Sequence, residues 1–542
     1  MKYLQLTIAF FITSPFLCQG QAQRLAEVTI SNGTLSGTIE QSQIRSFKGI
    51  PYAAPPVGDL RWKEPQPVAN WTGVRSADHF GNNGEQKKPF GDMGFRSSGM
   101  SEDCLYLNVW TPAKSATEKL PVLVYFFGGG FIAGDGSEPR YDGEAMARKG
   151  IVTLTVNYRL GIFGFMAHPE LTKESAHHAS GNYGLLDQHA ALVWVQQNIA
   201  AFGGDASRIT IAGESAGSIS VNAQMASPLS KDLIAGAIGE SGAMINPTLP
   251  AITLDEGEKN GLAFAGLVKA ASLADLRSMS AESLLNASTK PSAFKTAGTI
   301  DGYFLPEAPV AIFAAGKQAK VPLLAGWNSA EVPYQFLMHA DALTPASFTN
   351  KLKADYGDKS EYVLSLYPAS TQLEAIKSAT QLASDRFIVY STWKWNDQQV
   401  KTSGKPVYQY IFSKVKPPMT VQFSGMTAGL AGGMNKAKTT IEKVVTSVAQ
   451  GAPHAFEIEY AMGNLSSNHA YAFTAEDYRI SSQMLQYFAN FIKTANPNGP
   501  GLPHWSELRE AKPTYMEIGI KTHELPLTTI GRYQFLDKIY QK

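Results

Sequence analysis

The sequence lacks a strong excess of charge of either sign. Its 542 residues contain 47 Lys and Arg and 46 Asp and Glu, which leaves a formal net charge of +1. Charged residues make up 17% of the chain, and an average soluble domain has roughly 25%. Nucleic-acid binders usually carry a strongly basic face or tail, so no nucleic-acid partner is expected. Apolar residues reach 44%, which suits a large buried core and excludes a disordered chain.

Long apolar runs are also scarce, and the clearest one opens the chain. Leu4–Leu17 is mostly apolar, follows the basic residue Lys2, and precedes small and polar residues up to Ala22. This order is typical of a secretory signal peptide. Pro15 interrupts the run, which is shorter than the roughly 20 residues of a membrane-spanning helix. We expect residues 1–22 to be removed, which leaves a secreted or periplasmic protein without an integral membrane segment.

Cysteine is nearly absent. Cys18 and Cys104 are the two cysteines of the chain, and so few exclude a scaffold built from disulfides. Cys18 lies in the expected signal peptide. A lipoprotein anchor at Cys18 is an alternative, but the bulky residues before it do not suit one. Cys104 is therefore expected to be the single cysteine of the mature protein.

Short runs rich in β-branched and aromatic residues alternate with longer helical patterns. This alternation favours an α/β fold with a large, mostly parallel central sheet flanked by helices. The stretch Val28–Ile50 alternates in polarity, contains turn residues and is interpreted as an antiparallel edge. The predicted central strands are mostly near-continuous apolar runs, as in sheets covered on both faces: Pro121–Phe127, Ile151–Tyr158, Arg208–Ala212, Gly236–Ile238, Val321–Ala325 and Pro406–Phe412.

Helical patterns fill the regions between these runs. Tyr183–Ala201 is predicted to be a helix that ends at Gly203. Leu254–Ala297 and Pro345–Val400 lack good strand runs and are interpreted as helical excursions from the sheet. No boundary has the composition of a flexible linker. Residues 23–542 are therefore predicted to form a single domain, rather than the roughly three or four that length alone suggests.

The strongest local sign of chemistry is the segment Gly213–Gly217, with the sequence GESAG. It follows the predicted strand 208–212 and leads into a helical pattern, which is the context that a nucleophile elbow requires. Small residues flank Ser215 because the backbone turns sharply there. The turn is expected to place the Ser215 hydroxyl at the carboxyl end of a strand, facing a helix N-terminus.

A second signal is the segment Phe127–Phe131, with the sequence FGGGF, directly after a predicted strand. Consecutive glycines let backbone N–H groups approach a substrate oxygen. Gly129 and Gly130, with the N–H of Ala216, are predicted to form an oxyanion hole. The alternative is a flexible turn without a catalytic part.

These motifs resemble the type-B carboxylesterase family, the cholinesterase-like branch of the α/β-hydrolases, and in particular its secreted bacterial members. The resemblance covers nearly all of the chain after the signal peptide. It implies an α/β-hydrolase fold with helical insertions that form a cap over an active-site gorge. The matching segments are Phe47–Ala53, Arg61–Trp62, Ser101–Val109, Gly128–Phe131, Asn157–Arg159, Gly181–Gln188, Phe202–Asp205, Gly213–Gly217 and Ala495–Asn498.

A serine hydroxyl needs a base, usually a histidine held by a carboxylate. In an α/β-hydrolase the order along the chain is Ser, acid, His, so only histidines well beyond Ser215 qualify. These are His339, His454, His469, His504 and His523. The segment around His454, GAPHAFEI, resembles the catalytic-histidine segment of the family.

The same resemblance points to Glu331 as the acid. Glu331 follows the predicted strand Val321–Ala325 and stands where the family has its catalytic glutamate, whereas Asp301 resembles a structural aspartate. Glu214 is implied to be a second charge near the histidine, and Ser241 to lie near the acid.

The resemblance implies a secreted serine carboxylic-ester hydrolase that works through an acyl-enzyme, with a small-molecule ester as substrate. The sequence contains no metal-ligand spacing and no phosphate-binding loop, so no cofactor is expected. Two alternatives are a lipase acting on long-chain glycerides and a non-catalytic, cholinesterase-like binding protein. Retention of Ser215, Glu331 and His454 argues against the binding protein.

Three features depart from the family. Many relatives bond a cysteine at the position of Cys104 to an upstream loop, but Gly84–Lys88 contains none, so this loop is expected to be less tethered. Phe127 stands where His or Tyr is common, which predicts a missing hydrogen bond. The segment between Phe412 and His454 is unusually long, and residues 417–445 are predicted to be a Met-rich lid. A surface insertion without a catalytic part is the alternative.

Overall fold

The computed structural model describes residues 25–87, 93–339, 343–429, 434–436 and 451–540. The expected signal peptide, residues 1–22, lies outside the described residues. So do residues 430–433 and 437–445 of the expected lid, and the lid therefore stays a prediction.

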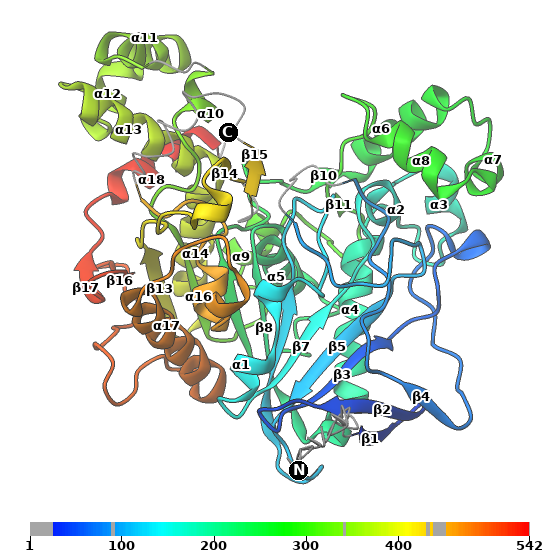
Figure 1. Ribbon diagram of the computed structural model, residues 1–542. Coiled ribbons are helices and arrows are strands. Elements are labelled where there is room, and N and C mark those ends of the chain that lie inside the picture. The colour runs from blue at the N-terminus through cyan, green and yellow to red at the C-terminus, as the bar shows by residue number, and fades with distance from the viewer. Residues whose placement is uncertain (1–24, 88–92, 340–342, 430–433, 437–450, 541–542) are drawn as a thin grey trace, which may run out of the picture.

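A single large sheet runs through the described chain and has thirteen strands (Figure 1). Its order is β1-β2-β3-β5-β7-β6-β8-β9-β12-β13-β16-β17, with β4 beside β2. Neighbouring strands are parallel from β7 to β16 and mostly antiparallel at the two margins. The strands are β1 (Leu25–Ile30), β2 (Gly33–Ile39), β3 (Arg45–Pro51), β4 (Val74–Ser76), β5 (Tyr106–Thr111), β6 (Leu120–Phe126), β7 (Val152–Val156), β8 (Gly204–Glu214), β9 (Gly236–Glu240), β12 (Leu323–Asn328), β13 (Val407–Phe412), β16 (Thr514–Ile518) and β17 (His523–Pro526).

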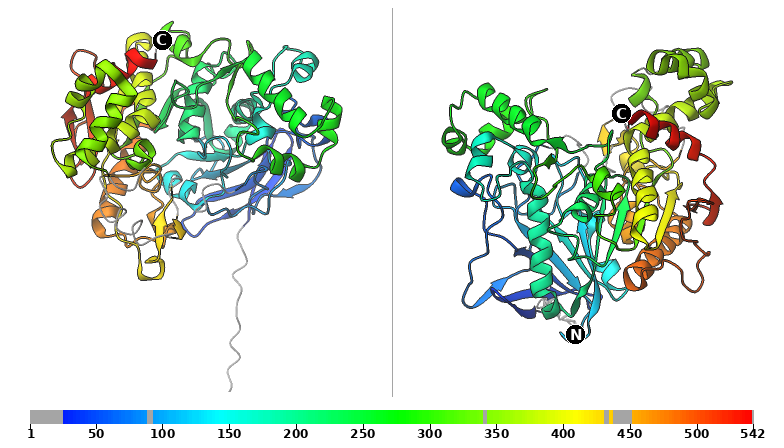
Figure 2. Two further views of the ribbon diagram at one scale, coloured as in Figure 1. Left: turned by 90° about the horizontal axis from the view of Figure 1, so that it is seen from above. Right: turned by 180° about the vertical axis from the view of Figure 1, so that it is seen from behind.

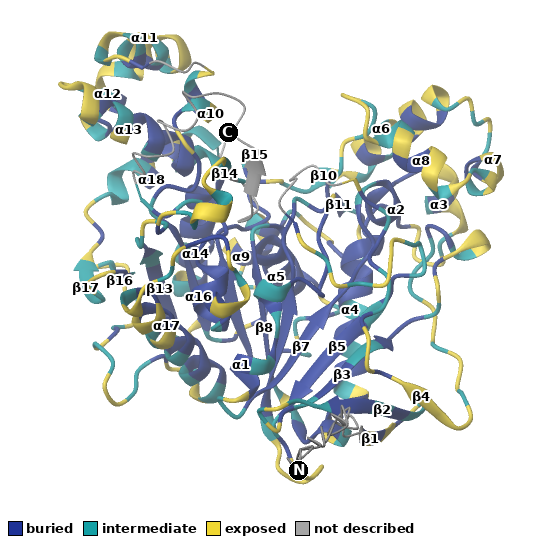
Figure 3. Ribbon diagram, in the orientation of Figure 1, coloured by how far each residue is buried: buried dark blue, intermediate teal, exposed yellow. Residues whose placement is uncertain are grey.

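The middle of the sheet is the core of the molecule. Every residue of β7, β9 and β12 is buried. The middle of the sheet, around β7 and β8, is mostly dark blue in Figure 3. Strands covered on both faces have continuous apolar sequences, which is why the six predicted central strands are all confirmed, with ends shifted by a few residues. The predicted antiparallel edge is confirmed as β1, β2 and β3.

Four strands of this sheet were not predicted from the sequence: β4, β5, β16 and β17. In β5, Asn108 interrupts the apolar pattern, yet its side chain is buried. The Asn108 amide accepts the N–H of Gly49 at 2.9 Å and donates to Thr155 Oγ1 at 2.9 Å. A polar residue that is fully hydrogen-bonded can thus occupy a central strand.

Helices flank the sheet and extend beyond one end of it. The predicted helix at Tyr183 is confirmed as α4, although it ends at Asn198, and a 3₁₀ turn continues to Phe202. The α-helices of the described residues are α1 (Glu144–Ala147), α2 (Gly161–Phe165), α3 (Pro169–Glu174), α4 (Tyr183–Asn198), α5 (Ala216–Ala226), α6 (Leu254–Leu267), α7 (Leu273–Ser278), α8 (Ala281–Ser288), α9 (Pro309–Ala314), α10 (Gln335–Met338), α11 (Pro345–Tyr356), α12 (Ser360–Leu366), α13 (Gln372–Ser384), α14 (Tyr390–Ser403), α16 (Ile458–Met462), α17 (Ala475–Thr494) and α18 (Ile530–Tyr540).

Two helical groups stand at the upper end of the sheet in Figure 1 and on opposite sides in the view from above (Figure 2). One group comprises α6–α8 and the other α10–α13. The first group lies within the predicted excursion Leu254–Ala297. The predicted excursion Pro345–Val400 is confirmed for α11–α13 only, because α14 packs against β12 and β13 of the sheet. None of the helices in the described part of the chain is long and apolar enough to cross a membrane.

A buried ion pair fixes the segment after β7 to α4. The guanidinium of Arg159 donates to both carboxylate oxygens of Asp187, at 2.7 and 2.8 Å. The backbone N–H of Arg159 also donates to this carboxylate, at 3.0 Å. Both side chains are almost fully excluded from solvent. Removing one partner of such a pair leaves the other charge buried without a counter-ion, in a medium that solvates it poorly.

The substitution Asp187→Ala is therefore expected to lower the free energy of unfolding by about 3–5 kcal/mol. Urea denaturation followed by far-UV circular dichroism measures this loss. As the control, Asp255→Ala removes an ion pair with Lys259 that is exposed on both sides, and the midpoint should not move. Equal midpoints for the two variants would show that the Arg159 pair is not structurally important.

Candidate active site

Ser215 occupies a sharp turn between β8 and α5. Its φ is 56° and its ψ is −120°, a conformation that L-residues rarely adopt. The flanking glycines make the turn sterically possible, since a Cβ on Gly217 would stand 2.0 Å from the carbonyl oxygen of Phe126. A Cβ on Gly213 would stand 2.5 Å from the carbonyl carbon of Gly217. The GESAG segment therefore has the strand–turn–helix geometry of a nucleophile elbow.

The structure brings His454 and Glu331 to Ser215. His454 Nε2 lies 2.9 Å from Ser215 Oγ, and His454 Nδ1 lies 2.6 Å from Glu331 Oε2. The backbone N–H of His454 donates to the carbonyl oxygen of Glu331 at 3.0 Å, which locks the two segments together. A neutral imidazole that donates from Nδ1 to the carboxylate leaves Nε2 free to accept the serine proton.

The second oxygen of Glu331 is held as firmly as the first. Oε1 accepts the hydroxyl of Ser241 at 2.6 Å and the backbone N–H of Asn328 at 2.6 Å. Glu331 itself is 1% exposed. Because both carboxylate oxygens are engaged, the carboxylate has little freedom to rotate away from His454.

Glu214 places a further carboxylate beside the histidine. Its Oε1 lies 3.2 Å from His454 Nε2, on the side of the ring that faces Ser215. Burial raises the pKa of Glu214 to about 7, against the opposing effect of His454 and Arg140. For His454, burial lowers the pKa, but the charges of Glu214 and Glu331 outweigh burial, so the pKa of His454 is raised above its ordinary value.

Sequence reasoning missed two more buried carboxylic acids in this region, Glu240 and Glu457. Glu240 accepts the hydroxyl of Tyr125 at 2.9 Å, and burial raises its pKa to about 8. Glu457 accepts the side-chain amide of Asn328, and burial raises its pKa well above the ordinary value. The sequence could have indicated them by position, because Glu240 directly precedes Ser241 and Glu457 follows His454 by three residues.

An aromatic contact on the histidine was also missed. Phe387 meets the imidazole of His454 edge to face, with ring centroids 5.2 Å apart. It belongs to a π-helical turn, Asp385–Val389, between α13 and α14. Such turns occur frequently at functional sites. The carbonyl oxygen of Phe387 accepts the hydroxyl of Thr248 at 2.7 Å.

The glycine run lies against the serine turn. Gly129 and Gly130 have φ values of 115° and 64°, which suit glycine. A Cβ on Gly128 would stand 2.6 Å from the carbonyl oxygen of Glu214, so the two segments touch through backbone. Among the hydrogen bonds of the described chain, none is donated by the N–H of Gly129, Gly130 or Ala216. These donors are thus free for an outside acceptor.

Two departures from the family can be placed in the structure. Cys104 is a buried free thiol, as predicted, and burial raises its pKa well above the ordinary value. Phe127 has no side-chain donor, but it stacks on Tyr158 with ring centroids 4.3 Å apart. The Tyr158 hydroxyl donates to the carbonyl oxygen of Phe127 at 2.7 Å. The start of the glycine run is therefore anchored by Tyr158.

Comparisons with a family model, with known relatives and with a solved structure all indicate the same family. Residues 24–535 match the family described as "Carboxylesterase family". The chain is 34% identical to a fumonisin B1 esterase of Sphingopyxis macrogoltabida, an alignment that covers 87% of this chain and 83% of the relative. It is 32% identical to the para-nitrobenzyl esterase of Bacillus subtilis (strain 168), with 87% and 90% covered. A solved PNB esterase structure matches with a TM-score of 0.76 at 30% identity, covering 94% of this chain and 98% of that one.

The chain therefore belongs to the carboxylesterase family, and its sheet and flanking helices form the α/β-hydrolase fold. Its class of activity is carboxylic-ester hydrolysis, as the motifs of the sequence indicated.

The carboxylates around His454 predict the pH dependence of this activity. His454, the general base predicted from the sequence, must be neutral to accept a proton, so activity should fall as the pH drops through its raised pKa. Glu214→Gln removes a negative charge 3.2 Å from Nε2. The acidic limb of kcat/KM should therefore move to lower pH in this variant. The profile is measured with a soluble ester, with Glu361→Gln on exposed α12 as the control. A limb that stays in place or moves to higher pH contradicts the assignment.

Proposed function

We propose that the protein hydrolyses carboxylic esters with Ser215 as nucleophile, His454 as general base and acid, and Glu331 as the carboxylate that orients His454. The observation that carries this proposal is the pair of contacts on one imidazole, 2.9 Å to Ser215 Oγ and 2.6 Å to Glu331 Oε2. These are hydrogen-bonding distances, and the order of residues along the chain is that of an α/β-hydrolase.

The reaction proceeds in two acyl-transfer steps. His454 accepts the proton of Ser215 as Oγ attacks the ester carbonyl, and then gives that proton to the leaving alcohol. A water molecule takes the place of the alcohol and loses a proton to His454 as it attacks the acyl carbonyl. His454 then returns the proton to Ser215 Oγ as the acid leaves. Glu331 stabilises the histidine cation that forms in each step and keeps its charge throughout.

The glycine run supplies the electrostatic part of catalysis. The N–H groups of Gly129, Gly130 and Ala216 bind the oxyanion that develops on the carbonyl oxygen. Donors without an internal partner suit this role, because they need no rearrangement when the charge forms. Loss of one such donor typically costs about 2.7–4 kcal/mol of transition-state stabilisation.

The natural setting of the reaction is proposed from the N-terminal sequence. We infer that the chain is exported and cleaved after Ala22, so that it meets small-molecule esters outside the cytoplasm. The relatives are named for different esters, among them para-nitrobenzyl esters and fumonisin B1. A small-molecule ester is the substrate class that these names share.

The direct test is Ser215→Ala assayed on a panel of soluble esters. We expect kcat/KM to fall by at least 10³-fold, since the nucleophile is lost. Ser207→Ala is a matched control, because Ser207 is exposed at the opposite end of the same strand, β8. Activity near the wild-type level in Ser215→Ala would overturn the proposed mechanism, whereas a loss in Ser207→Ala would point to damage to the strand.

A further inference from the structure

The glycine turn, defined here as Phe127–Gly134, is held at its C-terminal end by the side chain of Gln86. The carboxamide of Gln86 makes two hydrogen bonds to Gly134: Oε1 accepts its N–H at 2.8 Å, and Nε2 donates to its carbonyl oxygen at 2.9 Å. The same Nε2 donates to the carbonyl oxygen of Gly84 at 3.0 Å. Gln86 is 5% exposed, so these bonds are shielded from water.

Gly134 packs closely against Phe127 and Gly128, at the start of the turn. Its φ is 129°, and a Cβ there would stand 2.3 Å from the Phe127 ring and 2.5 Å from the carbonyl oxygen of Gly128. The turn also closes on itself, because the N–H groups of Ile132 and Ala133 both donate to the carbonyl oxygen of Gly129 at 3.1 Å. The position of Gly134 therefore constrains that of Gly128 and Gly129.

Two other bonds fix the turn, and both act elsewhere in it. Tyr158 donates to the carbonyl oxygen of Phe127 at 2.7 Å, and Gly161 donates its N–H to the carbonyl oxygen of Phe131 at 2.7 Å. The end of the turn at Gly134 is reached by Gln86. Gln86 thus attaches its loop to the glycine turn, whereas the absence of a cysteine in Gly84–Lys88 had predicted a less tethered loop.

We propose that Gln86 is a positioning residue for ester hydrolysis: its carboxamide holds Gly134 so that the N–H groups of Gly129 and Gly130 point at the developing oxyanion. The proposal rests on the proposed function, in which these two groups bind the oxyanion. It also assigns to Gln86 the tethering of the loop that many relatives fix with a disulfide.

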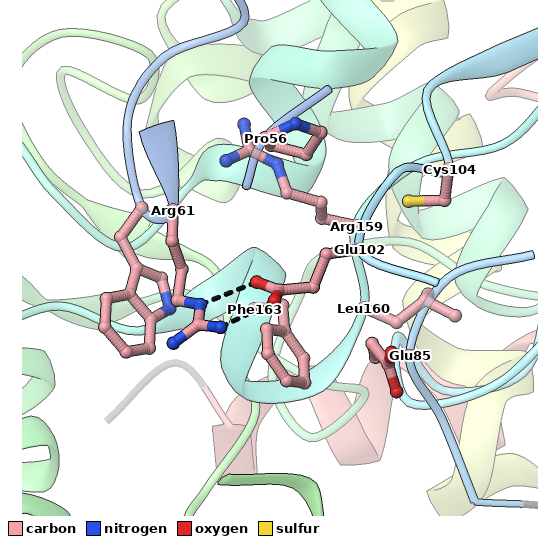
Figure 4. Close-up of a pocket in the computed structure, with 9 residues that line it drawn as sticks. Pro56, Arg61, Glu85, Glu102, Cys104, Arg159, Leu160 and Phe163 are labelled. Carbon is pink, nitrogen blue, oxygen red and sulfur yellow. Dashed lines mark hydrogen bonds and ion pairs between the residues drawn. The ribbon is translucent and has the colours of Figure 1, made fainter. Parts of the chain in front are cut away.

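The neighbourhood of Cys104 provides a way to test tethering separately. Figure 4 shows Cys104 and Glu85, the residue before Gln86, lining the same small cavity. A Cβ on Gly84 would stand 3.6 Å from Cys104 Sγ. A cysteine introduced at position 84 is therefore within reach of Cys104 for a disulfide, with a small shift of the backbone. This bond would fasten the loop without a carboxamide.

The first measurement is the steady-state kinetics of Gln86→Leu, which keeps side-chain bulk and removes all three hydrogen bonds. Because the oxyanion forms only in the transition state, kcat should fall about 10- to 100-fold while KM stays within about twofold. The inhibition constant of a trifluoromethyl ketone, which forms an oxyanion on the serine, should rise in parallel. Gln66→Leu is the control, since Gln66 is exposed in the same part of the chain.

The second measurement is rescue. In Gly84→Cys/Gln86→Leu, oxidation should restore most of the lost kcat, and dithiothreitol should abolish the gain. Thiol titration reports whether the disulfide has formed. If Gln86→Leu does not fold, Gln86→Glu carries the kinetic test, since a carboxylate still accepts from Gly134 but cannot donate to its carbonyl oxygen. It too should lose kcat at constant KM.

Two results for Gln86→Leu would overturn the role of Gln86: a kcat within twofold of wild type, or a loss of kcat/KM that comes from a higher KM. So would a disulfide in the double variant that forms without restoring kcat. These outcomes are distinct from failure of the proposed function. Full activity in Ser215→Ala would remove the mechanism itself, whereas an inactive Ser215→Ala with unchanged Gln86 variants would remove only this inference.

Discussion

The site depends on the burial of one carboxylate, Glu331, next to one imidazole. A carboxylate taken out of water loses several kcal/mol of solvation unless hydrogen bonds replace its hydration. Here Ser241, the N–H of Asn328 and His454 supply those bonds, at 2.6 Å each. The same bonds that make burial possible also fix the plane of the carboxylate and, through it, the orientation of His454. The same contacts thus stabilise the buried carboxylate of Glu331 and set the orientation of His454.

The order of strands in the sheet explains how residues distant in sequence meet. β8, β9 and β12 are parallel neighbours, so their carboxyl ends lie at one edge of the sheet. Ser215 follows β8, Ser241 follows β9, and Glu331 lies just beyond β12. The segment before His454 joins this edge through the N–H of Ala330, which donates to the carbonyl oxygen of Ala452 at 2.9 Å. Ligand sites at this edge are general in open α/β sheets.

The sequence allowed much of this arrangement to be predicted, and the limits have physical causes. Central strands could be located because burial on both faces leaves continuous apolar runs. The GESAG turn could be located because side chains at Gly213 and Gly217 would collide with the backbone. Strand β5 was missed because Asn108 is satisfied by partners far away in the chain. The contacts of Phe387 on His454 and of Gln86 on Gly134 were missed for the same reason, since each joins segments separated by dozens of residues. Local sequence patterns do not indicate which distant residues will be in contact.

The central claim is that Ser215 becomes acylated during turnover. Mass spectrometry of the enzyme after acid quenching during reaction with a slowly deacylating ester, followed by peptide mapping, tests it directly. The account predicts an acyl group on the peptide that contains Ser215, at a level that reaches a plateau within the burst of alcohol release. An acyl group on another residue, or steady turnover with no acylated peptide, would contradict it.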